Sequence, residues 1–178
     1  MPVARPDTMP TICKYIMDRK PKTILDIGIG FGMYGFLARN YGVVWNNKLT
    51  QKQYNNWKEE IIVDGIEIYE PFITDLHRMI YNTIFIGDVS EIAPTLKDYE
   101  LYIMGDVLEH LEKDDAIELI NKLKKKGNLL IATPNYFHEG SSNLGNKYDL
   151  HKCVLEDSDF PDNPPIIHIG RQKVVIYE

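Results

Sequence analysis

The chain alternates short apolar runs with longer amphipathic stretches. Five of the runs are mostly apolar, as strands are when helices cover both faces of a parallel sheet. They span residues 23–27, 61–68, 83–86, 100–104 and 128–133. Two further runs, 166–169 and 174–177, flank a short turn that contains Gly170, a pattern typical of an antiparallel hairpin. The sequence therefore predicts an α/β fold that ends in a hairpin.

Apolar residues recur at helical spacing between these runs. Three stretches are predicted to be helices: 11–18, one that begins at Pro71, and 113–126. The inner face of the second is expected to carry Phe72, Leu76, Met79 and Ile80. His77 is expected at its surface or boundary. Residues 1–10 contain three prolines and no clear period, so we expect an extended lead-in there.

A polar segment, 43–60, interrupts the alternation. It follows Gly42, which is expected to end the preceding helix, and it is longer than the two to six residues usual for such a connection. It is either an insertion with its own turn of helix or a loop on the substrate side. Its aromatic residues, Trp45, Tyr54 and Trp57, could line an acceptor pocket or could pin the segment to the domain.

Length and composition predict one domain spanning 1–178. The 20 basic and 26 acidic side chains give a formal charge of -6, which offers no basic footprint for a nucleic acid. No apolar run approaches the ~20 residues of a membrane span. Cys13 and Cys153 lie far apart, and the N-terminus lacks the apolar core of a signal peptide. We therefore expect a cytoplasmic protein with reduced thiols.

The stretch 22–35, KTILDIGIGFGMYG, is predicted to run from a strand through three glycines into a helix. Gly28, Gly30 and Gly32 have no Cβ, so the backbone can turn sharply and approach a ligand closely. The helix start offers unpaired N–H groups and the positive end of a dipole. The end of the strand, Ile27, is expected beside the same ligand. The stretch is typical of a nucleotide-type cradle.

Acidic residues stand at three predicted strand ends. Asp26, two residues before the first glycine, suits a ligand with a cationic amino group better than a pyrophosphate. Glu67 can accept both hydroxyls of a ribose. Asp88 can accept from an adenine amine, while the N–H of Val89 serves a ring nitrogen. Because the ligand side of an open α/β sheet is the carboxyl edge of its strands, these residues are expected to meet one ligand.

Five segments occur in the order found in class I S-adenosylmethionine (SAM) dependent methyltransferases: LDIGIGFG, GIEI, GDV, MGDVLEHL and IATPN. The first contains D-x-G-x-G-x-G, which resembles motif I of these enzymes. The chain is similar to small-molecule members, including the ubiquinone-biosynthesis O-methyltransferases and the type 11/12 group, over roughly 22–135. The resemblance implies SAM as methyl donor and a Rossmann-like, doubly wound, mostly parallel sheet of seven strands. It also implies a small-molecule acceptor, methylated at oxygen rather than carbon or nitrogen.

Methyl transfer requires alignment of the acceptor and, for a hydroxyl, removal of a proton. Gly105 begins the stretch GDVLEHL, which should overlook the sulfonium. His110 and His151 are candidate bases, because an unperturbed histidine titrates near pH ~6.5. Asp106 is a third candidate, with the alternative of holding the methionine end of SAM. We rank His110 first because the preceding strand fixes its position.

Other assignments stay open at this point. No histidine or cysteine pair has the spacing that fixes two ligands on one element, so no metal site is predicted. The dipeptide Glu109–His110 permits a divalent metal, as is thought for some ubiquinone-type relatives. The protein could also bind SAM without transferring its methyl group, as a regulatory or scaffold module. It could instead be an NAD(P)-dependent oxidoreductase, because Gly30, Gly32 and Gly35 satisfy G-x-G-x-x-G. Asp26 and the DVLEHL and TPN segments count against the oxidoreductase.

Overall fold

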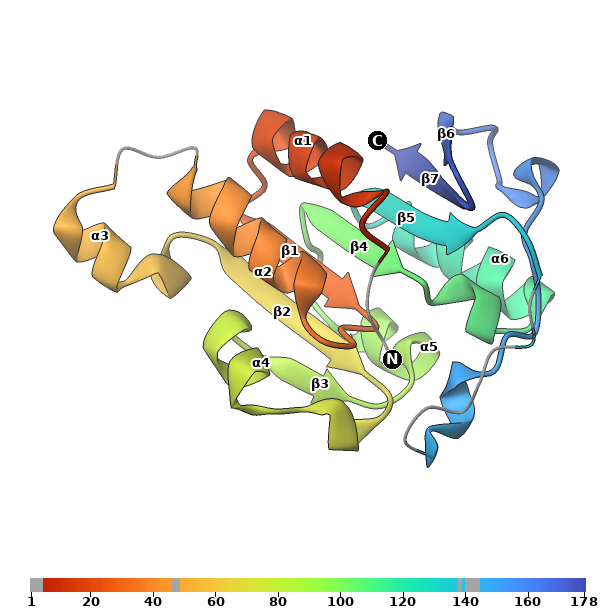
Figure 1. Cartoon of the computed structure of the whole chain (residues 1–178), viewed down its shortest axis with the longest axis horizontal. Coiled ribbons are helices and arrows are strands. Elements are labelled where there is room, and N and C mark those ends of the chain that lie inside the picture. Colours follow the sequence, from red (N-terminus) through yellow and green to blue (C-terminus); the bar gives the residue numbers. More distant parts are fainter. Residues whose placement is uncertain (1–4, 46–48, 138, 140–144) are drawn as a thin grey trace.

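The computed structural model describes residues 5–45, 49–137, 139 and 145–178. Its centre is a seven-stranded sheet in the order β3-β2-β1-β4-β5-β7-β6 (Figure 1). The strands are β1 (Thr23–Ile27), β2 (Ile62–Glu67), β3 (Ile84–Ile86), β4 (Leu101–Gly105), β5 (Asn128–Pro134), β6 (Ile166–Ile169) and β7 (Gln172–Tyr177). Strands β1 to β5 pair in parallel, and β7 runs antiparallel to both β5 and β6. The predicted mostly parallel sheet with a C-terminal hairpin is confirmed.

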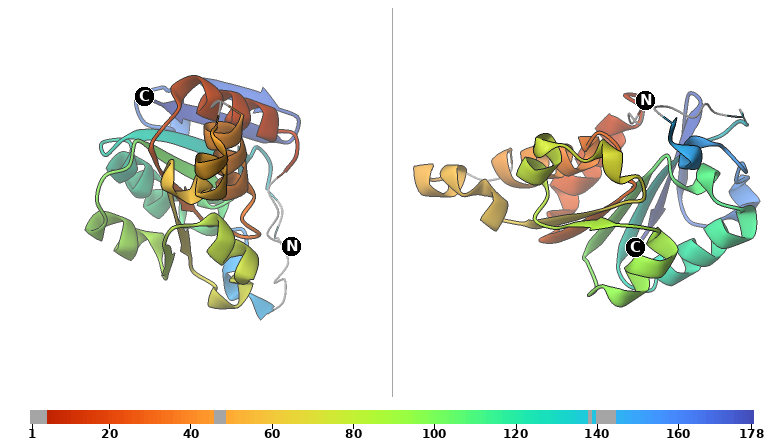
Figure 2. Two further views of the ribbon diagram at one scale, coloured as in Figure 1. Left: turned by 90° about the vertical axis from the view of Figure 1, so that its left-hand side faces the viewer. Right: turned by 90° about the horizontal axis from the view of Figure 1, so that it is seen from below.

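Helices cover both faces of the sheet (Figures 1 and 2). They are α1 (Met9–Arg19), α2 (Met33–Arg39), α3 (Gln51–Asn55), α4 (Asp75–Ile80), α5 (Val89–Ile92) and α6 (Lys113–Leu123). Alternate side chains of one strand serve the two faces: Ile24 packs with α1, α2 and α4, whereas Leu25 and Ile27 pack with α5 and α6. The doubly wound prediction is confirmed. The longest described helices have 11 residues, and none in that part of the chain has the length and apolarity to cross a bilayer.

The strand order reverses between β1 and β4. Asp26 pairs with Gly65 of β2 on one side and with Ile103 of β4 on the other. Strands β2 and β3 are therefore added on one side of β1, and β4 and β5 on the other. Crossover helices then diverge to opposite faces, and a crevice opens at the carboxyl ends of the two strands. This edge is where the predicted acidic residues converge.

Helix α4 begins four residues after Pro71, not at it. Pro71 lies in a 3-10 turn, and Thr74 is the N-cap: its side chain and that of His77 form a capping box. The later start rotates the inner face, so that His77 and Ile80 are buried whereas Met79 is 63% exposed. The prediction that His77 lies at the surface is therefore wrong.

The polar segment contains α3 and lies at the end of the sheet opposite the strand carboxyl ends (Figures 1 and 2). Gly42 does not end the preceding helix, which continues as a π-helical turn to Val44. The Arg39 guanidinium lies 5.3 Å from the ring centroid of Trp57, which fastens the segment to α2. Tyr54 is exposed. The helix α3 and its place away from the strand carboxyl ends favour the insertion over a loop on the substrate side.

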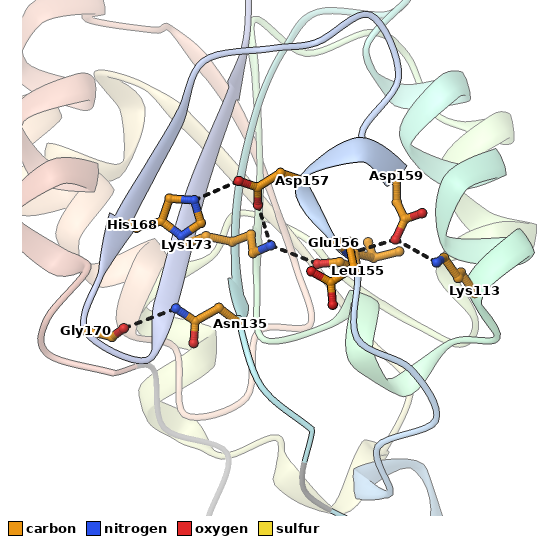
Figure 3. A network of polar contacts seen from close by, with 9 residues as sticks. All are labelled: Lys113, Asn135, Leu155, Glu156, Asp157, Asp159, His168, Gly170 and Lys173. Atoms are coloured by element: carbon orange, nitrogen blue, oxygen red, sulfur yellow. Dashed lines mark hydrogen bonds and ion pairs between the residues drawn. The ribbon is translucent and has the colours of Figure 1, made fainter.

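A polar network fastens the chain between β5 and β6 to the hairpin (Figure 3). Lys173 on β7 is 2% exposed, and its ammonium donates to the Leu155 carbonyl at 2.9 Å and to Asp157 Oδ1 at 2.7 Å. Asp159 pairs with Lys113 of α6 at 2.7 Å. The same connecting chain carries the predicted base His151, so these contacts hold its C-terminal side against the sheet.

Candidate functional site

A cavity of about 540 Å³ lies at the carboxyl edge of β1, β2 and β4, within the size range of small-molecule sites. Ten predicted site residues line it: Ile27, Gly28, Gly30, Glu67, Asp88, Val89, Gly105, Asp106, His110 and His151. The structure thus brings together the glycine cradle, all three later strand ends and both candidate histidines. Asp26 and Gly32 are not among the lining residues.

The cradle is shaped by left-handed glycines and is tied to β2. Gly28 and Gly32 have φ of +71° and +85°, and a Cβ at Gly28 would lie 2.4 Å from Val107 Cγ2. The N–H groups of Gly28 and Ile29 donate to the Ile66 carbonyl, and that of Gly30 donates to Glu67. The expectation of unpaired N–H groups concerned the start of α2, where the Gly35 N–H donates to Asp26 Oδ2. The pairing of Gly28, Ile29 and Gly30 fixes the cradle before any ligand arrives.

Asp26 lies behind the cradle and is completely buried. Its Oδ2 accepts from the Gly35 N–H at 2.9 Å and from the Tyr81 hydroxyl at 2.6 Å. Burial raises the pKa of Asp26 to about 7, against the effect of both hydrogen bonds. Through Oδ2 this carboxyl joins the start of α2 to the end of β1, while Oδ1 is buried without a hydrogen-bond partner among the described residues. Its contact with a ligand's amino group stays a prediction.

Glu67 faces the cavity and also holds the cradle. Its Oε2 accepts from the Gly30 N–H at 3.0 Å and its Oε1 accepts from the Tyr69 N–H at 2.9 Å. Burial raises its pKa, and these backbone donors oppose that effect. Each carboxylate oxygen can accept more than one hydrogen bond, so both retain capacity for hydroxyl donors of a ligand.

Asp88 and Val89 form the start of α5 at the cavity wall. Asp88 is the N-cap, and its Oδ1 accepts from the Ser90 N–H at 2.8 Å. The N–H of Val89 belongs to the first helical turn, where backbone donors lack intrahelical acceptors. A carboxylate and a backbone N–H thus stand side by side, as recognition of an adenine edge requires.

Gly105 is in close contact with Tyr34, a residue that was not predicted to belong to the site. A Cβ at Gly105 would lie 1.9 Å from Tyr34 Cε2, so the tyrosine ring occupies the space of the missing side chain. Tyr34 is buried, lines the cavity and comes from the first turn of α2. Its position directly after the glycines was the available signal. The pair closes the cavity between the cradle and β4.

Two carboxyl groups lie beyond Gly105. Asp106 adopts a left-handed φ of +53°, uncommon for a residue other than glycine, and its Oδ1 accepts from Gln172 Nε2 at 2.9 Å. Glu109 is 2% exposed, and its Oε2 accepts from the Thr133 hydroxyl at 3.2 Å. Burial, reinforced by the charge of Asp106, holds the pKa of Glu109 well above its ordinary value. Burial also raises the pKa of Asp106.

His110 and His151 meet edge to face, with ring centroids 4.9 Å apart. His110 Nδ1 lies 3.2 Å from the Leu150 carbonyl. Because a carbonyl only accepts, this contact assigns the proton to Nδ1 and leaves the lone pair on Nε2. Ligand atoms of Glu109, His110 and His151 lie within 4.8 Å of one another, a donor set that divalent metals accept. The spacing argument against a metal therefore fails, because the two histidines come from separate segments.

Arg5 also lines the cavity, although the sequence suggested only a lead-in there. Its Nη2 lies 3.3 Å from Asp7 Oδ2, while its Nε is buried without a hydrogen-bond partner among the described residues. A lone arginine in a segment without periodicity gives no signal in the sequence. The guanidinium supplies a positive charge to a cavity whose lining includes five carboxyl groups.

No protein-family model matches the chain, and no curated protein matches it. Solved structures similar to it include an O-methyltransferase family protein from Burkholderia thailandensis, 13% identical, with a TM-score of 0.63 over 95% of this chain and 54% of that one. The N-terminal domain of EvdMO1, in the presence of S-adenosylhomocysteine (SAH) and D-fucose, is 11% identical with a TM-score of 0.60 over 97% and 82%.

PigF with SAH is 16% identical, with a TM-score of 0.56 over 95% of this chain and 61% of that one. The chain thus spans little more than half the length of the Burkholderia protein. At these identities the likeness shows the fold, which is that of the class I methyltransferases.

Proposed function

We propose that this chain binds SAM in the 540 Å³ cavity and transfers its methyl group to an oxygen of a small molecule. The observation that carries the proposal is the convergence of the glycine cradle, Glu67, Asp88 and His110 on that one cavity. The fold shared with the O-methyltransferases supports it. When bound, SAM supplies a sulfonium methyl group that is already activated for displacement.

The cradle side holds the cofactor. Glu67 accepts from the ribose hydroxyls, and Asp88 with the N–H of Val89 recognises the adenine edge. Arg5 offers a guanidinium to the carboxylate of the methionine part, since its Nε is buried and lacks a protein partner in the described chain. Asp26 acts indirectly, because its hydrogen bond from Gly35 holds the start of α2 against β1 beside the cradle.

The other side handles the acceptor. His110 Nε2, whose lone pair follows from the Nδ1 contact with Leu150, accepts the proton that a hydroxyl loses as its oxygen takes the methyl group. His151 packs against this ring and limits its rotation. Asp106 is the second candidate for the base, because it lines the cavity and its carboxyl group is oriented by a hydrogen bond from Gln172 to Oδ1.

The base needs no metal in this proposal. If a divalent cation were held by Glu109, His110 and His151, it would polarise the acceptor oxygen instead. We expect turnover to persist in excess EDTA. Loss of turnover in EDTA, restored by Mg²⁺ or Zn²⁺, would reassign the histidines from proton acceptance to metal binding.

The sheet order argues against a dinucleotide oxidoreductase. Such folds use parallel strands in the order 3-2-1-4-5-6, whereas here β7 runs antiparallel between β5 and β6. Gly35, one of the glycines that satisfied the dinucleotide pattern, donates its N–H to Asp26 and packs under Tyr81.

We also propose one domain in a reducing cytoplasm, which the free thiols of Cys13 and Cys153 support.

Calorimetric titration with SAM, SAH and NAD tests the proposal. Wild type is expected to bind SAM and SAH but not NAD, and Glu67→Ala to weaken both at least tenfold. Glu118→Ala, an exposed carboxylate on α6, is the matched control and should bind as wild type. SAH release with a panel of hydroxyl acceptors then tests transfer, which His110→Ala should slow by about 10²-fold or more. Binding of NAD alone would refute the cofactor, and SAM binding without any turnover would favour a non-catalytic module.

A further inference from the structure

We propose that His77 is a positioning residue of the cofactor site, which fixes the carbonyl of Gly30 from the side opposite the cavity. The inference rests on the proposed function, because it assigns a role in binding SAM. His77 lies on α4, outside the motifs that carry the methyltransferase resemblance. It is completely buried, and it does not line the cavity.

Both ring nitrogens of His77 have defined partners. Nδ1 lies 3.0 Å from the Thr74 backbone nitrogen, which can only donate, so Nδ1 carries a lone pair. Nε2 lies 2.8 Å from the Gly30 carbonyl, which can only accept, so Nε2 carries the proton. The two contacts define one neutral tautomer. The ring therefore connects the first turn of α4 to the glycine cradle.

Gly30 is held on both sides of its Cα. Its N–H donates to Glu67 Oε2 at 3.0 Å, and its carbonyl accepts from His77 at 2.8 Å. Gly30 has a left-handed φ of +50° and lines the cavity, so a rotation of either peptide would change the surface that the cofactor meets. Glu67 can exchange part of its bonding for a ligand, whereas His77 makes its contact away from the ligand.

The surroundings of the ring favour a fixed orientation. The ring of Tyr81 stacks on His77 with an interplanar angle of 12°, and Phe31 meets it edge-on. A Cβ at Gly32 would lie 3.4 Å from His77 Cδ2, so the imidazole packs closely against the backbone at this glycine. Tyr81 also donates to Asp26. His77 and Tyr81 thus form a buried pair of rings that packs against Gly32 and Gly35.

Capping of α4 alone does not require histidine. The usual capping box places Glu or Gln at this position, since the cap needs only an acceptor. The imidazole adds a donor at Nε2, and this donor leaves its own helix to reach Gly30. The added atom is what ties α4 to the cofactor loop.

Two substitutions distinguish the contact made by Nδ1 from the contact made by Nε2. His77→Asn keeps an acceptor near the Nδ1 position but has nothing at the Nε2 position, so it retains the cap and loses the contact with Gly30. His77→Gln places an amide N–H near the Nε2 position and can restore that contact. SAH affinity is measured by calorimetry for both variants and wild type, and far-UV circular dichroism with urea titration reports their folding.

We expect SAH affinity to fall about tenfold in His77→Asn, as loss of one hydrogen bond that orders the loop implies. In His77→Gln it should stay within about threefold of wild type. Equal losses in the two variants, wild-type affinity in His77→Asn, or failure of His77→Asn to fold would overturn the proposal, because the residue would then serve the core and not the cradle. Absence of SAH binding by wild type would instead refute the proposed function.

Discussion

Asp26 should make the stability of this protein depend on pH in the unusual direction for a carboxyl group. Its pKa of about 7 in the folded state compares with 3.8 in an ordinary carboxyl. At 1.36 kcal/mol per pKa unit, this difference corresponds to about 4 kcal/mol. The cause is burial, since two hydrogen bonds to Oδ2 do not replace the water that the charge loses.

The sign follows from proton binding. Between pH 4 and 7 the folded state retains the Asp26 proton while the unfolded chain has released it, so the free energy of unfolding falls as pH rises. Below pH 4 both states are protonated and the stabilisation is complete. Above pH 7 both are ionised and it is lost. The buried carboxyls Glu67, Asp106 and Glu109 act in the same direction, so wild type alone does not isolate Asp26.

The substitution Asp26→Asn isolates the contribution of Asp26 to the pH dependence of stability. The amide oxygen can accept from Gly35 and Tyr81 as Oδ2 does, and the amide does not titrate. Urea unfolding followed by far-UV circular dichroism at pH 5, 6, 7 and 8 gives the free energies of both proteins. The free energy of unfolding of the variant, relative to that of wild type, should rise by about 1.4 kcal/mol per pH unit between pH 5 and 6.5. Any loss of stability that the substitution causes at every pH shifts this difference by a constant and leaves its slope unchanged. A difference that stays constant over this range would refute the reasoning.

Three further predictions concern separate contacts. Gly105→Ala should weaken SAH binding tenfold or more in calorimetry, because the new methyl group displaces Tyr34; unchanged affinity would show that the ring moves freely. Asp157→Asn should lower the free energy of unfolding in urea by about 1–2 kcal/mol, because it removes a charged partner of Lys173, and no change would mean that Leu155 suffices. Trp57→Ala should cost about 0.5–1 kcal/mol and leave SAH affinity intact; weaker SAH binding would contradict the position of its segment.

The sheet was predictable because burial on both faces makes its strands nearly continuous apolar runs. The 3-10 turn and the capped start of α4 were not predictable, because the apolar residues around Pro71 are compatible with helices that begin at different residues and bury different faces. His77 was consequently assigned to the wrong face. A Thr followed three residues later by a side chain that can accept was the signal for the true start.

The lining of the cavity was predictable where it comes from the ends of parallel strands. Glu67, Asp88 and Gly105 reach the cavity because parallel strands deliver their carboxyl ends to one edge. The direction in which Asp26 points was not predictable, since it depends on the packing of Tyr81, which is distant in sequence. The pairing of His110 with His151 likewise depends on the path of a long connection that has no periodicity.

Both tryptophans of the chain, Trp45 and Trp57, belong to the polar segment 43–60. The helix of this segment, α3, lies at the opposite end of the sheet from the strand carboxyl ends that form the cavity (Figure 1). Neither lines the cavity, and Trp45 is 68% exposed. Intrinsic tryptophan fluorescence should therefore change little when a ligand enters the cavity. It should change when this peripheral segment unfolds locally. The segment is accordingly a suitable place for a fluorophore or surface tether, and a poor place from which to monitor catalysis.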